Sequence, residues 1–110
     1  MLRLQPWKPA DATNEIRQLA NAGNSLNISR TRHFVEQLAI RDLLIGDAHY
    51  VMKHGFVYQE AQESTQEGLY KYRIDSKSPN SGSRALRVVL IPDPARFWIK
   101  LITIMWVDEA

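Results

Sequence analysis

The chain has 110 residues, of which 45% are hydrophobic and 24% charged, with a formal net charge of +2 and no cysteine. This length fits one domain, and the apolar fraction is that of a globular protein rather than a disordered or collagen-like chain. Without cysteine, a thiolate nucleophile, a disulfide framework and a cysteine-ligated metal cluster are excluded. No apolar run is long enough to span a membrane and the first residues lack the pattern of a signal peptide, so we expect a cytoplasmic protein.

Three helices are predicted in the first half of the chain, where apolar residues recur at helical spacing. The first two end near Ala22 and Arg41, and the third covers residues 48–54. Each follows residue types that cap helix N-termini: Asp11 or Thr13, Ser29 or Thr31, and Asp47.

After Gly55 the pattern changes to that of strands, which are predicted over residues 56–60, 69–75, 85–91 and 97–107. Because short connections favour antiparallel neighbours, we expect an α+β fold with N-terminal helices packed on a four-stranded antiparallel sheet. Within one compact domain, residues 1–28 are predicted to be an N-terminal extension with one helix. Residues 29–110 are predicted to be the α+β domain proper.

Positive charge is concentrated between residues 71 and 100, which hold seven Lys or Arg against two Asp, a local balance of +5. Clustered cations suit an anionic partner such as RNA. The same side chains also fit the solvated face of a sheet, and the sequence does not separate these two interpretations.

Three basic residues on successive predicted strands are candidates for a phosphate site. Lys71 and Arg73 share a face by the period of two, and Arg87 on the next strand can lie on that face. Guanidinium groups clamp phosphates and stabilise the charge that grows during phosphodiester cleavage. His33 on the second predicted helix, or a tyrosine, is the candidate base for a 2′-hydroxyl nucleophile. A lone helical histidine also has ordinary structural roles, so this alternative stays open.

The sequence indicates neither a metal site nor a cofactor. His49 and His54 are five residues apart, whereas two ligands on one helical face need a spacing of three or four. There is no Gly-rich phosphate loop, no G-x-S-x-G and no H-E-x-x-H motif. These absences argue against nucleotide-triphosphate enzymes, serine hydrolases and metalloproteases.

Part of the chain resembles a small bacterial family known as domain of unknown function 4258. Residues 31–41, TRHFVEQLAIR, look like its RHxxERMxxR helix. A downstream set is similar to its DVxxVLxxGxV segment: Asp47, Ala48, Val51, Gly55 and Val57. The family is grouped with RelE-, BrnT- and colicin-D-like ribonucleases, so the resemblance implies a RelE-like or barnase-like fold and metal-independent cleavage of RNA. It also implies an antitoxin protein as partner.

Position by position, the resemblance reaches His33, Arg41, Arg73 and Arg87. The predicted catalytic residues are therefore His33, Arg73 and Arg87, and the predicted substrate-binding residues are Lys71, Arg41 and Lys100. The alternative is a non-catalytic interaction module on the same fold, with an apolar patch built around Phe97, Trp98 or Trp106.

Overall fold

The computed structural model describes residues 3–109. In chain order these form α1 (Pro9–Ala20), β1 (Asn27–Arg30), α2 (Arg32–Ile40), α3 (Ile45–His54), β2 (Phe56–Val57), β3 (Gln62–Glu63), β4 (Tyr70–Ser76), β5 (Leu86–Asp93) and β6 (Trp98–Trp106). Short 3-10 helices cover Gly23–Ser25, Pro94–Arg96 and Val107–Glu109. The fold is α+β, as predicted, and no helix within residues 3–109 is long and apolar enough to cross a membrane.

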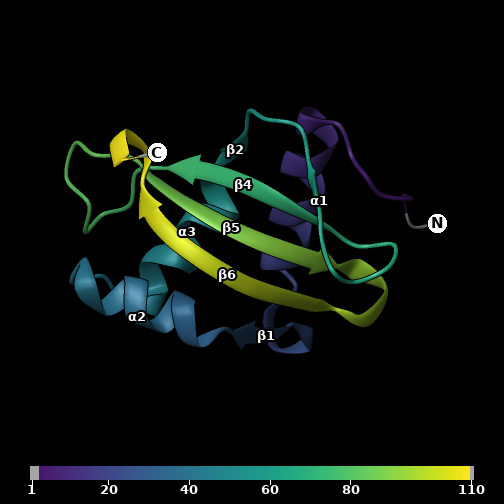
Figure 1. The fold of residues 1–110 in the computed structure, drawn as a ribbon, viewed down its shortest axis with the longest axis horizontal. Helices are drawn as coiled ribbons and strands as arrows, with labels where there is room; N and C mark the ends of the chain where they lie inside the picture. Colours follow the sequence, from purple (N-terminus) through teal and green to yellow (C-terminus); the bar gives the residue numbers. More distant parts are fainter. Residues whose placement is uncertain (1–2, 110) are drawn as a thin grey trace.

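A mixed six-stranded sheet forms the centre of the fold, and five of its strands follow the order β1-β6-β5-β4-β2 (Figure 1). The sixth, β3, pairs separately with β4. β4, β5 and β6 form an antiparallel meander, whereas β1 is parallel to β6. The prediction of four antiparallel strands was therefore wrong in the number of strands and in one direction. The two unforeseen strands are short and largely polar, and their partners β6 and β4 lie far along the chain or across a loop, so local apolar alternation gives no signal for them.

The helices cover one face of this sheet. In Figure 1, α1 and α3 lie behind β4, β5 and β6, and α2 lies along the edge next to β6. The core between these layers includes Trp7, Ile16, Phe34, Val51, Tyr72, Ile74, Val88, Leu101 and Ile104. Residues of the predicted N-terminal extension are part of this core, because the Trp7 ring stacks on Tyr72 with centroids 5.2 Å apart.

Two of the three predicted N-terminal caps were wrong, because the helices begin at other residues. Thr31 caps α2 as predicted, its hydroxyl accepting from the Phe34 N–H at 3.0 Å. α1 begins earlier than predicted because Pro9 occupies its first position, where a fixed φ favours the helix and no N–H is lost. α3 also begins earlier, and Asp47 lies inside its first turn, where its carboxylate accepts from the Leu44 N–H at 2.8 Å.

Candidate nucleic-acid interface

Four of the six predicted site residues lie on the sheet face opposite the helices. Strand register pairs Asp75 with Arg87, Arg73 with Val89, and Ile91 with Lys100. Odd-numbered residues of β4 and β5 point to one side of the sheet, which places Lys71, Arg73 and Arg87 on the same face. Lys100 of β6 is on this face too, because it lies directly opposite Ile91. No α-helix of residues 3–109 lies in front of these strands in Figure 1. We call this surface the open face.

Arg87 is held by Asp75 on the neighbouring strand. Its Nε and Nη2 donate to the two carboxylate oxygens at 2.9 and 3.0 Å, and both side chains are nearly buried. The hydrogen bond to Asp75 raises the pKa of the Arg87 guanidinium. These donors are therefore already engaged, and the geometry favours a role for Arg87 in joining β4 to β5 over direct contact with a phosphate.

Three cations of the open face have no carboxylate partner within residues 3–109. Arg73 donates from Nη1 to the side-chain oxygen of Gln59 at 2.6 Å, and neither Lys71 nor Lys100 makes an ion pair. All three are partly exposed. At the far end of β5, the Asp93 carboxylate forms an ion pair with Arg96, with Nη1 and Oδ2 2.8 Å apart. The unpaired positive charges therefore lie on β4 and β6, on either side of β5, whose residues on this face are buried.

Aromatic side chains lie beside these cations at two edges of the sheet. Phe56 pairs in register with Asp75, which places it on the open face, and 50% of its surface is exposed. Tyr58 follows two residues later and is 69% exposed. Trp98, at the β6 side, donates from its indole N–H to the Ser29 hydroxyl at 2.8 Å. From the sequence, Tyr58 is a tyrosine that could stack on a base if exposed, whereas Phe56 was not singled out. Alternation around the apolar Val57 is the sequence signal that places both rings outward.

His33 lies away from the predicted catalytic arginines. It is exposed on α2, whose buried residue Phe34 packs into the core on the helix side. Within residues 3–109, no hydrogen bond or ion pair joins His33 to Arg73 or Arg87. The start of α2 is fixed to β6 instead, because the Thr31 hydroxyl donates to the carbonyl of Ile102 at 2.9 Å.

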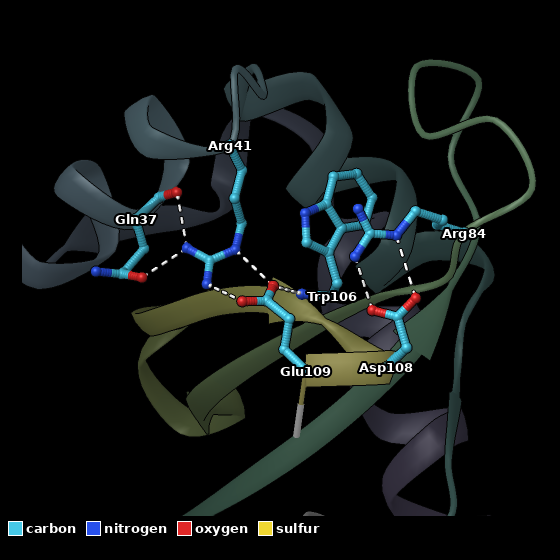
Figure 2. A network of polar contacts seen from close by, with 6 residues as sticks. All are labelled: Gln37, Arg41, Arg84, Trp106, Asp108 and Glu109. Carbon is cyan, nitrogen blue, oxygen red and sulfur yellow. Dashed lines mark hydrogen bonds and ion pairs between the residues drawn. The ribbon is translucent and has the colours of Figure 1, made fainter.

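Arg41 is also separate from the open face and binds the C-terminal turn. Figure 2 shows its guanidinium between Gln37 and Glu109, with hydrogen bonds of 2.9 and 2.8 Å to the two oxygens of the Glu109 carboxylate. The same carboxylate accepts from the Trp106 N–H at 2.7 Å. The Arg41 guanidinium, followed by this N–H, holds the pKa of Glu109 below its ordinary value.

A second arginine–carboxylate pair lies on the other side of Trp106. Arg84 packs over the indole with its guanidinium carbon 4.1 Å from the ring centroid, and it pairs with Asp108 at 2.7 Å (Figure 2). The hydrogen bond from Arg84 lowers the pKa of the Asp108 carboxyl. The carboxylates of Asp108 and Glu109 therefore neutralise Arg84 and Arg41, so these two arginines are not free to bind an anion.

The buried tyrosine of the core is no base near neutral pH. Burial raises the pKa of Tyr72 to about 12, although its hydrogen bond from Trp7 acts in the opposite direction. Its hydroxyl accepts from the Trp7 N–H at 2.9 Å and donates to the Gln5 side-chain oxygen at 3.1 Å. Burial, with a smaller contribution from Lys53, lowers the pKa of His49.

Among residues 3–109, no group of three or more His, Asp or Glu side chains is arranged to hold a metal ion. Of the aromatic residues predicted for an interaction patch, Phe97 is half exposed, whereas Trp98 and Trp106 are partly buried.

No family model, no curated protein and no solved structure matches the chain. The resemblance to the ribonuclease-related family therefore stays a prediction.

Proposed function

We propose that this chain binds RNA on its open face and cleaves it without a metal ion, as a toxin-like endoribonuclease of RelE-like fold acting in the cytoplasm. The observation that carries the proposal is the sheet face on which, within residues 3–109, no helix lies and Lys71, Arg73 and Lys100 have no carboxylate partner. The RNA backbone carries one negative charge per phosphate, and Lys or Arg side chains without a carboxylate partner can neutralise these charges. An acidic antitoxin protein covering the same face is the partner that this charge favours.

The proposed cleavage centre lies toward the β6 edge. Thr31 anchors the start of α2 at Ile102, and His33 is two residues beyond that anchor. Lys100 precedes Ile102 by two residues on the same strand. We infer that Lys100 binds the scissile phosphate and that His33 is the candidate base, while Arg73 holds a neighbouring phosphate farther along the RNA. Arg87 keeps a positioning role through Asp75.

The binding part is tested by fluorescence anisotropy with a labelled RNA over a range of salt concentrations. Releasing counterions makes the affinity of a phosphate binder fall steeply with salt, and each lost contact lowers that slope by about one. Lys71→Ala, Arg73→Ala and Lys100→Ala should each weaken binding and flatten the slope. Lys53→Ala is the matched control, because Lys53 is exposed on α3, away from the open face, and also carries one positive charge.

The cleavage part is tested by incubating the same RNA with the folded chain in EDTA. Loss of cleavage in His33→Ala and Lys100→Ala, with circular dichroism unchanged, would support the assignment. RNA binding without cleavage would favour the non-catalytic module. If the wild-type chain shows neither salt-dependent binding nor cleavage, the proposed function fails.

A further inference from the structure

Two exposed aromatic rings lie side by side at the β2 edge of the open face. The ring centroids of Phe56 and Tyr58 are 6.2 Å apart, with an angle of 32° between the ring planes. They are half or more exposed, whereas Val57 between them is buried and packs inward. Both residues therefore remain at least half accessible to a ligand, and we call the two rings the aromatic ridge.

Grooves lie on both sides of the aromatic ridge. One, of about 490 Å³, separates it from α1 and includes Arg17 in its wall. The other, of about 310 Å³, includes Asp75 and Lys77. Phe56 and Tyr58 line both grooves, so a planar group entering either one meets an aromatic ring. Both volumes are in the lower range of those that hold small ligands, which suits a single nucleobase.

A fixed cation lies against the aromatic ridge. The guanidinium carbon of Arg17 is 4.4 Å from the Phe56 ring centroid. Its Nε and Nη2 donate to the carbonyls of Gly55 and His54, both at 2.9 Å. Because carbonyl acceptors orient a guanidinium without neutralising it, Arg17 keeps its full charge beside the ring, and no carboxylate pairs with it within residues 3–109.

The other side of the ridge continues into the basic open face. Gln59, which follows Tyr58, accepts from the Arg73 guanidinium at 2.6 Å. Arg17 therefore contacts Phe56 directly, and Arg73 binds the residue that follows Tyr58. A base stacked on the ridge would have cations available for the phosphates on both sides of its sugar.

We propose that Tyr58, supported by Phe56, stacks on an unpaired nucleobase of RNA bound to the open face. This inference rests on the proposed RNA binding and specifies its substrate class. A base within a duplex is already stacked on its neighbours, so only a single-stranded segment offers a free face to an aromatic side chain. The chain therefore prefers single-stranded RNA to a duplex of the same sequence.

The test uses two RNA probes of about ten nucleotides, one single-stranded and one duplex, a length within the range that such binding sites cover. A 2-aminopurine in the single strand reports stacking, because its fluorescence is quenched when it stacks on an aromatic ring. Tyr58→Ala should weaken single-strand binding about ten-fold and remove the quenching, while Tyr58→Phe retains both. Phe97→Ala is the matched control, since Phe97 is also half exposed but lies at the opposite end of the sheet.

The outcomes separate the stacking site from the proposed function. If Tyr58→Ala binds single strands as well as the wild type does, while Arg73→Ala has lost affinity, the stacking site is wrong and RNA binding stands. Equal affinity of the wild type for the single strand and the duplex would also overturn the site. If the wild type binds neither probe at low salt, both the function and the site fail.

Discussion

Arg87 and Asp75 lie opposite each other on β5 and β4, and the guanidinium donates from Nε and Nη2 to the two carboxylate oxygens at 2.9 and 3.0 Å. This pair lies on the same face as Lys71, Arg73 and Lys100, which form no ion pair with the part of the chain that the structure describes. It divides a row of similar residues into one that maintains the sheet and others that are available to a ligand. Charge alone therefore does not separate the candidate binding residues from one that maintains the sheet, whereas the presence or absence of a carboxylate partner does.

The first prediction concerns the stability of this pair. Arg87→Ala leaves the nearly buried Asp75 carboxylate without its partner, so we expect the free energy of unfolding to fall by about 2–3 kcal/mol. Urea denaturation of the purified chain measures this loss. Asp75→Asn/Arg87→Ala removes the unpaired charge and should recover part of the stability. If Arg87→Ala unfolds at the same urea concentration as Arg73→Ala, the pair has no structural role.

The elements formed by local pattern were predictable, and those formed by distant pairing were not. Alternation in β4 correctly placed Lys71 and Arg73 on one face and Tyr72 and Ile74 in the core. β1 was missed because its four residues become a strand only through parallel pairing with β6, about seventy residues away. Its local sequence, NISR, carries little of the apolar alternation that marks a half-buried strand.

The same distinction applies to the candidate site. The ion pair of Arg87 with Asp75 depends on the register of β4 against β5, and the nine residues between Ser76 and Leu86 leave that register open. The position of His33 depends on β1 and on the anchor of α2 at Ile102. Both facts belong to tertiary structure, so sequence could group basic residues but could not tell which were already paired.

The second prediction concerns Asp47, which links α3 to the loop between β4 and β5. Its buried carboxylate accepts from the Leu44 N–H and the Ser78 hydroxyl, both at 2.8 Å. Asp47→Ala removes both acceptors, and we expect a loss of about 2–3 kcal/mol in the free energy of unfolding. Ser78→Ala keeps the contact within the helix and should cost about 1 kcal/mol. Equal losses in the two variants would show that the helix contact contributes nothing.

The third prediction compares two glycines at opposite ends of α3. A Cβ at Gly55 would lie 2.5 Å from the Val51 carbonyl oxygen and 2.8 Å from that of Asp75, whereas a Cβ at Gly46 meets nothing within 4 Å. Backbone atoms cannot move aside cheaply, so Gly55→Ala should destabilise the chain by about 2 kcal/mol or more. Gly46→Ala should stabilise it by up to about 1 kcal/mol, since alanine favours a helix. Thermal melting measured by circular dichroism checks both, and a Gly55→Ala chain as stable as the wild type would contradict the close approach of α3 to β4.

The fourth prediction follows from the buried hydroxyl of Tyr72. Burial raises its pKa in the folded chain to about 12, above the ordinary value of about 10 that applies after unfolding. The neutral hydroxyl therefore stabilises the fold fully below pH 10, and this contribution is lost as the pH rises toward 12, because the unfolded chain gives up the proton first. We expect the free energy of unfolding to fall by up to about 3 kcal/mol over this range, relative to a Tyr72→Phe variant measured in the same way. That variant should be less stable near neutral pH by about 1–2 kcal/mol, because the buried N–H of Trp7 loses its acceptor. Urea denaturation of both chains from pH 8 to 12 measures the difference, and a difference that does not change with pH would show that Tyr72 ionises as an exposed tyrosine does.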